Sequence, residues 1–291
     1  MIKSQSAMEY LMTYGWAILI IAVVLAALFE LGVFNPITFA PKASPGSCQV
    51  VRPEGAGTTN FISLEGECNG ELPQYVASFN GASGLVSTPT KGFSGGAAVQ
   101  FTLSAWIYQN NVNTRHYILG YGSDLSNSQI LMSTNEFSAG QFSLETCGNG
   151  WTSDATLLPN VWYNLVISYN GVGNPSFYVN GVNYGVADTW GSPAISPVDS
   201  NGIIGNGEPC NPSIYMNGYI ADAEVYNISL SANDINALYK EGIGGAPIKI
   251  QNLVGWWPLN GNANDYSGNG NNGVPSGVTY TSNWYSGYST P

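Results

Sequence analysis

The chain shows two different patterns of apolar and polar residues, one near its start and one over most of its length. No charged residue occurs from Trp16 to Phe29, and the weakly polar stretch extends from Ala7 to Phe34. In a helix with ~1.5 Å of rise per residue, this stretch exceeds the ~20 residues that a membrane span needs. Because such a helix is apolar on nearly every face, it needs lipid or other apolar helices around it.

Downstream of Tyr75, apolar and polar residues alternate, which is the pattern of strands with one buried face. Asn-Gly pairs, which tolerate positive φ, predict tight turns at 80–81, 170–171, 180–181 and 217–218. The strands expected from this pattern are Tyr75–Phe79, Phe101–Tyr108, Tyr117–Tyr121, Ile130–Met132, Gln141–Leu144, Trp162–Tyr169, Ser176–Val179, Val182–Val186 and Gly218–Tyr226. A short helix with Ser231 as N-cap and Asp234 three residues later is expected over Ser231–Tyr239. Many short strands at close spacing predict a β sandwich.

The start of the apolar stretch carries one acidic residue, Glu9, which is costly in lipid without a partner. The segment Lys3–Leu11 (KSQSAMEYL) resembles the class III signal peptide of archaeal type IV pilins. The resemblance implies cleavage between Ser4 and Gln5, and a Glu9 carboxylate that pairs with the new α-amino group of a neighbouring subunit during assembly. An uncleaved membrane anchor is the alternative.

Composition argues against nucleic-acid binding. The formal net charge is -11, the sequence pI is about 4.2, and no cluster of lysine and arginine stands out. Such a chain repels phosphate backbones. Charged residues make up only 9% of the chain, so Asn, Gly, Ser, Thr and Tyr must supply most of the polar surface.

The four cysteines, Cys48, Cys68, Cys147 and Cys210, form no CxxC pair, and the single histidine, His116, is far from them in sequence. A zinc site therefore has little support. An even number of widely spaced cysteines after an apolar segment predicts disulfides in an oxidising compartment. Of the three pairings that four cysteines allow, sequence proximity favours Cys48–Cys68 with Cys147–Cys210.

These features divide the chain into four parts. Residues 1–4 are the expected leader, 5–35 the hydrophobic helix, 36–74 a disulfide-closed connector, and 75–291 the β domain. Asn35-Pro36 ends the expected helix because proline cannot continue the hydrogen-bond ladder.

Several segments of the β domain together resemble the laminin-G-like, concanavalin-A-type jelly roll. They are YVASFNG (75–81), FTLSAWIY (101–108), WYNLVISYNG (162–171), FYVNGV (177–182) and the strand and helix over 217–239. The resemblance implies an all-β jelly-roll sandwich.

One segment, LVGWWPLNGNANDYSGNGNNG (253–273), resembles the opening of this family but follows its closing strand and helix. Circular permutation would dock it beside Gly218–Tyr226, with Val274–Tyr280 next to Tyr75–Phe79. Alternatively, the strand inserts into a neighbouring subunit, or it begins a truncated second repeat.

Several polar residues are candidates for binding calcium or a glycan, and for some of them a structural role explains the same pattern. In the loop 260–273, Asn262, Asn264 and Asp265, with Asn269 and Asn271, offer oxygens for calcium, which laminin-G-like domains often bind; tight turns explain the same residues. Asp222 matches an acidic position of the family and is a second calcium candidate. Asn227 begins an Asn-Ile-Ser sequon and is a candidate glycosylation site.

Aromatic residues give a further hypothesis. If exposed, they could stack on sugars, although tryptophans in a jelly roll are more often part of its core or rim. The candidates are Trp151, Trp190, Trp284, Tyr285 and Tyr288.

The sequence favours a structural protein, not an enzyme. It predicts an archaeal pilus-like surface filament that polymerises through its N-terminal helices, sits in the membrane before assembly, and displays a β head for adhesion or carbohydrate binding. One alternative is a membrane-anchored monomeric adhesin or lectin. The other is an anchored glycosidase, for which Asp222 and Glu224 are the nearest approach to a carboxylate set.

Overall fold

The computed structural model describes residues 14–15, 17–26, 72–89, 99–122, 129–147, 149–191, 195, 201–207, 209–289 and 291. Residues 14–15 and 17–26 are helical. The rest of the helix expected over 5–35 lies outside the described residues, as do Ser4, Gln5, Glu9, Cys48 and Cys68. Within the described part of the chain, no helix combines the length and apolarity that crossing a membrane requires.

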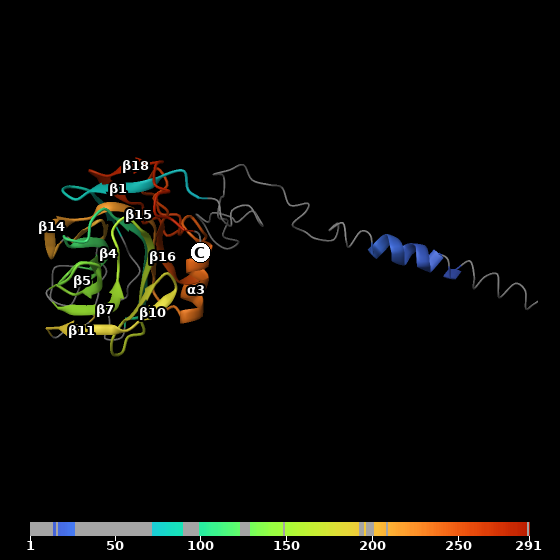
Figure 1. Cartoon of the computed structure of the whole chain (residues 1–291), viewed down its shortest axis with the longest axis horizontal. Coiled ribbons are helices and arrows are strands. Elements are labelled where there is room, and N and C mark those ends of the chain that lie inside the picture. The colour runs from blue at the N-terminus through green and yellow to red at the C-terminus, as the bar shows by residue number, and fades with distance from the viewer. Residues whose placement is uncertain are drawn as a thin grey trace, which may run out of the picture.

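Two antiparallel sheets are layered into a β sandwich (Figure 1). The strands of the first sheet are β1 (Val76–Asn80), β3 (Phe101–Gln109), β8 (Trp162–Tyr169), β9 (Ser176–Val179), β10 (Val182–Tyr184), β15 (Asn217–Tyr226), β16 (Leu253–Trp257) and β18 (Thr279–Thr281). Their order is β10-β9-β8-β3-β15-β1-β18, and β16 also pairs with β15. The expected all-β class is thus confirmed.

The second sheet has the order β11-β7-β6-β5-β4-β12-β2-β17. Its strands are β2 (Leu85–Thr88), β4 (His116–Gly122), β5 (Gln129–Thr134), β6 (Gln141–Glu145), β7 (Gly150–Thr156), β11 (Val186–Trp190), β12 (Gly202–Ile204) and β17 (Val274–Ser276). A separate hairpin of β13 (Asn206–Gly207) and β14 (Asn211–Tyr215) covers part of its outer face, where Cys210 and Ile214 pack on Tyr117 and Leu131.

The main hydrophobic core lies between the two sheets. From β3, the alternating residues Phe101, Leu103, Ala105 and Ile107 all belong to it, as their spacing predicts. The intervening residues of β3 are buried as well, so this strand is covered on both faces. The second covering comes from a helix and from the C-terminal segment.

The helix α3 (Ala232–Glu241) packs Ile235 and Leu238 against the outer face of the first sheet. Its predicted capping box is present, with Ser231 accepting from the Asp234 backbone and Asp234 accepting from the Ser231 backbone. Beside it, the C-terminal segment buries Trp284, whose indole meets that of Trp162 edge to face. The first sheet therefore sits in the middle of three layers.

The displaced segment docks in its own sheet. Strand β16 pairs antiparallel with β15, with Glu224 opposite Trp256, which confirms the permuted arrangement. Strand β18 pairs with β1 as expected. Strand β17, however, pairs with β2 in the second sheet, so residues 274–281 cross from one sheet to the other.

The Asn-Gly pairs have two different roles. Asn180 and Gly181 have φ of 52° and 72° and form the tight turn of the β9–β10 hairpin, as predicted. The turn predicted at Asn217-Gly218 is wrong, because both residues lie inside β15 and pair with its neighbours. Gly218 has φ of 145°, and a Cβ there would overlap the Tyr108 carbonyl oxygen. This glycine permits a close approach between β15 and β3.

Candidate binding site

A cavity of about 540 Å³ opens on the outer face of the second sheet. It is lined by Arg115, Glu136, Phe137, Glu145, Cys147, Trp190, Pro209, Cys210 and Asn211. Strands β4, β6 and β11 and the segments beside them supply one wall, and the tip of the β13–β14 hairpin supplies the other. The site therefore exists only where the hairpin meets the sheet.

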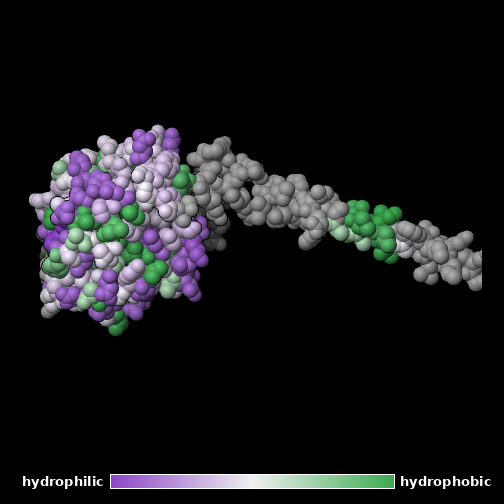
Figure 2. Space-filling view, in the orientation of Figure 1, coloured by the Kyte–Doolittle hydropathy of each residue, from purple (hydrophilic) through white to green (hydrophobic). Residues whose placement is uncertain are grey.

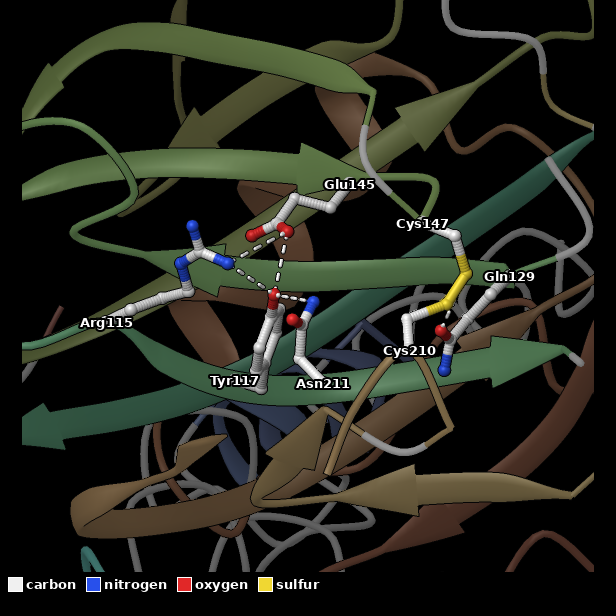
Figure 3. The surroundings of a disulfide bond; sticks show 7 residues. All are labelled: Arg115, Tyr117, Gln129, Glu145, Cys147, Cys210 and Asn211. Atoms are coloured by element: carbon white, nitrogen blue, oxygen red, sulfur yellow. Dashed lines mark hydrogen bonds and ion pairs between the residues drawn. A yellow bond between two sulfur atoms is a disulfide. The ribbon is translucent and has the colours of Figure 1, made fainter. Parts of the chain in front are cut away.

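A hydrogen-bonded group of charged and polar side chains forms one side of the cavity (Figure 3). Tyr117 Oη donates to Glu145 Oε2 at 2.7 Å and accepts from Arg115 Nη1 at 3.0 Å and from Asn211 Nδ2 at 2.8 Å. The other oxygen of Glu145 accepts from Ser133 Oγ at 2.5 Å. The Tyr117 hydroxyl thus connects the sheet to the hairpin.

Arg115 also forms an ion pair with Glu136 through Nη2, and its Nη1 lies 3.7 Å from Glu145 Oε2. The side chains of Glu136 and Glu145 are only 6% and 4% exposed. Burial, followed by the negative charge of Glu145, raises the pKa of Glu136 to about 7 against the opposing effect of Arg115. Burial likewise raises the pKa of Tyr117.

A disulfide joins Cys147, just after β6, to Cys210 at the tip of the hairpin, with a Cα–Cα distance of 5.5 Å. This bond confirms the second pair predicted from sequence proximity. Both cysteines line the cavity, and Gln129 lies beside them (Figure 3). The disulfide therefore holds the two walls of the cavity together.

Two aromatic side chains stand at the cavity. Phe137 is 61% exposed, and its ring meets that of Trp190 edge to face, with 5.0 Å between the centroids. Of the aromatic residues proposed to stack on sugars, Trp190 alone lines this cavity. Trp151 and Trp284 are core residues, at 3% and 0% exposure, and Tyr285 and Tyr288 belong to the C-terminal segment.

A family model described as the concanavalin A-like lectin/glucanases superfamily matches residues 80–236, a little over half of the chain. The chain belongs to this superfamily. The matched span ends within α3, so the permuted strands β16, β17 and β18 follow it. No curated protein sequence matches the chain.

Solved structures of similar fold have low sequence identity to this superfamily member. A candidate carbohydrate-binding protein of Bacteroides ovatus is 17% identical, with a TM-score of 0.54, over 72% of this chain and 60% of its own. The heptameric SAP-like pentraxin of Limulus polyphemus is 15% identical, with a TM-score of 0.50, over 72% of this chain and 94% of its own. The chain thus spans less than two thirds of the Bacteroides protein, and the likeness concerns the fold.

In this superfamily member, the acidic residues suggested as a glycosidase pair lie away from the cavity. Asp222 and Glu224 are 4% and 1% exposed on β15. Asp222 accepts from Trp256 Nε1 at 2.6 Å, and Glu224 accepts from Tyr226 Oη at 2.6 Å. Burial raises the pKa of Asp222 to about 7 and that of Glu224 well above its ordinary value. The fold encloses both carboxyls, so neither faces solvent.

The calcium candidates of the 260–273 loop are engaged in turns. Asp265 Oδ1 accepts from the backbone of Trp256 and Ser267, and its Oδ2 accepts from the backbone of Asn271. Asn262 Oδ1 accepts from the backbone N–H of Asn264. Asp222 accepts from the indole of Trp256, whereas Asp265 accepts from its backbone, so Asp222 does not join this set.

Among the described residues, no group of three or more His, Cys, Asp or Glu side chains is arranged to hold a metal. Calcium at this loop stays a prediction, and the turns account for its residues.

Two other residues singled out from the sequence occupy contrasting places. His116, the single histidine, is 1% exposed and hydrogen-bonds to Gln109 and Thr114. Asn227 is exposed just after β15, and the hydroxyl of Ser229 in its sequon contacts Ser168 Oγ at 2.8 Å. The exposure of Asn227 is compatible with its predicted glycosylation.

Proposed function

We propose that the β sandwich is the carbohydrate-binding head of a cell-surface protein, and that the cavity between sheet and hairpin is its binding site. The observation that carries this proposal is the combination of an aromatic rim, Phe137 and Trp190, with the hydrogen-bonding groups of Arg115, Glu145 and Asn211. Aromatic rings pack on the apolar face of a sugar, and carboxylates, amides and guanidinium groups bind its hydroxyls. The likeness to the candidate carbohydrate-binding protein of Bacteroides ovatus supports the proposal.

Binding is favoured over hydrolysis. The carboxyls of Glu136 and Glu145 both pair with Arg115, so its guanidinium group lies beside the two of them. Glycosidase pairs stand about 5–10 Å apart so that the sugar, or sugar and water, fits between them. The other acidic pair, Asp222 and Glu224, is enclosed in the fold. We therefore propose a lectin-like role without catalysis.

Truncation of Trp190 to alanine should weaken glycan binding about tenfold or more, because aromatic anchors carry a large share of binding energy in such sites. The experiment screens the full chain on a glycan array and then measures the best glycan by calorimetry. Leu158→Ala removes an apolar side chain that is 60% exposed and does not line the cavity, so it should leave the affinity unchanged. Equal affinities for both variants, or an array without any bound glycan, would contradict the proposal.

The apolar N-terminal segment supports a second part of the proposed function. From Ile18 to Leu25, each described isoleucine, leucine and valine side chain is between 49% and 65% exposed. In Figure 2 these residues form a continuous apolar band, whereas the visible face of the sandwich is mostly polar with small apolar patches. An apolar helix with all its faces exposed needs lipid or copies of itself as surroundings. We propose that it lies in the membrane first and then assembles the chain into a pilus-like filament.

Filaments sheared from the cell surface should contain this chain with Gln5 as the mature N-terminal residue. The expected result follows from cleavage between Ser4 and Gln5, which leaves Glu9 near the new α-amino group. Mass spectrometry of the N-terminal peptide measures it directly. An intact Met1 on a chain that stays with the detergent-extracted membrane would instead favour an anchored monomeric adhesin, and would leave the carbohydrate-binding proposal untouched.

A further inference from the structure

We infer that the cavity selects uncharged saccharides and rejects carboxylated ones, because its guanidinium group is already neutralised by two carboxyl groups of the protein. This inference rests on the proposed carbohydrate binding and concerns the ligand class of the same site. It depends on the donors of Arg115, on the enclosure of Glu136 and Glu145, and on the charge that these three groups carry together.

The donors of Arg115 are turned toward the protein. Its Nη2 pairs with Glu136, and its Nη1 donates to Tyr117 Oη at 3.0 Å and lies 3.7 Å from Glu145. Arginine recognises a carboxylate most strongly through two parallel N–H bonds from its planar fork. Because both terminal nitrogens already face acceptors of the protein, Arg115 keeps single N–H donors for sugar hydroxyls, and its charge is already compensated when an acidic sugar approaches.

The two carboxyls need donors, not further acceptors. Glu145 accepts from Tyr117 and Ser133, whereas Oε2 of Glu136 is enclosed and has no hydrogen-bond partner in the described part of the chain. Because this oxygen is enclosed, a proton held by the carboxyl itself satisfies it. A ligand carboxylate in the cavity supplies no such proton, because it offers only acceptors, and its charge repels both glutamates.

The net charge of the site depends on pH. Burial and the charge of Glu145 raise the pKa of Glu136 to about 7, while Arg115 lowers it. The remaining titratable group of the cluster, Tyr117, faces Glu145 and Arg115. Near pH 6 the glutamate pair retains a proton, and with Arg115 the group is close to neutral. As pH rises through 7, the proton leaves and the group becomes negative. Rejection of acidic sugars should therefore strengthen as pH rises.

A matched pair of ligands tests the inference. The probes are the neutral glycan that binds best on the array, the same glycan with its primary hydroxyls oxidised to carboxylates, and the methyl ester of that oxidised glycan. The ester keeps the carboxyl carbon and both oxygens, adds one methyl group and removes the charge. Calorimetry with the full chain should show the carboxylate bound about tenfold more weakly than the ester at pH 8.5, with a smaller ratio at pH 6.

Substitution of one glutamate provides the complementary test. Glu136→Gln keeps the shape of the side chain and removes the titrating carboxyl, so the ratio between ester and carboxylate should shrink and lose its pH dependence. Asp154→Asn makes the same chemical change at an exposed residue of β7 that does not line the cavity, and the ratio should stay as in the parent protein. A carboxylate bound as tightly as the ester overturns the inference and leaves carbohydrate binding standing. If no glycan binds in any form, the proposed function itself fails.

Discussion

Replacement of Cys147 and Cys210 together by alanine should lower the free energy of unfolding of the sandwich by about 4 kcal/mol, because their disulfide closes a long loop. The two cysteines are 63 residues apart, and the cross-link removes many conformations from the unfolded chain. Urea unfolding followed by tryptophan fluorescence measures the difference. The double variant is preferable to reduction of the parent protein, since a reductant would also act on the predicted Cys48–Cys68 pair.

The same substitution should weaken glycan binding. The disulfide anchors the hairpin tip that brings Pro209 and Asn211 to the cavity. Without it, the hydrogen bond from Asn211 Nδ2 to Tyr117 Oη at 2.8 Å still joins this tip to the sheet. Asn211→Ala removes that hydrogen bond and keeps the disulfide, so it should weaken binding while the free energy of unfolding changes much less. Unchanged stability and unchanged binding in the double cysteine variant would show that the hairpin holds its place without the disulfide.

Strands were predictable where apolar residues alternate over a long run. The strands β3, β8 and β15 follow the predicted ranges to within a residue or two, and Ser231 caps α3 as predicted. The sequence analysis did not single out β7, with the sequence GWTSDAT, because it is rich in polar residues and gains its strand conformation by pairing with β6 and β11. The local alternation of apolar and polar residues carries no information about such pairing between strands.

The cavity was not predictable for a related reason. Its charged residues come from different strands or loops, and Arg115 and Glu136 are 21 residues apart in the sequence. Only the pairing of β4, β5 and β6 brings Arg115, Glu136 and Glu145 together. The one available signal was the predicted Cys147–Cys210 disulfide, which places residue 147 beside the hairpin. For Asp222 and Glu224, the local pattern gave no sign that α3 and the C-terminal segment cover the outer face of the first sheet.

The buried carboxyls of Asp222 and Glu224 should make the sandwich less stable as pH rises. Asp222 retains its proton in the native state up to about pH 7, whereas in the unfolded chain it loses it near pH 3.8. Its stabilising contribution is therefore complete below pH 3.8 and is lost progressively between pH 3.8 and about pH 7, by an amount on the order of 4 kcal/mol. Glu224, with its pKa raised well above the ordinary value by burial and then by Asp222, extends the loss to higher pH. The other titratable groups near this pair are Tyr226, Tyr288 and Glu241.

The double variant Asp222→Asn with Glu224→Gln should flatten this dependence, because each amide oxygen still accepts from Trp256 or Tyr226 and carries no titrating group. Between pH 4 and 6.5 His116 acts in the opposite direction, since burial lowers its pKa to about 4 and its stabilising contribution disappears as pH falls. The decisive window is therefore pH 7 to 9, where His116 is neutral in both states and the remaining loss comes from Glu224, because Asp222 has completed its loss by about pH 7. There the free energy of unfolding should fall with pH in the parent protein and in Asp154→Asn, and fall much less in the double variant. A parent profile that stays level or rises over this window would mean that Glu224 ionises without cost, and hence that the covering of β15 opens to water in solution.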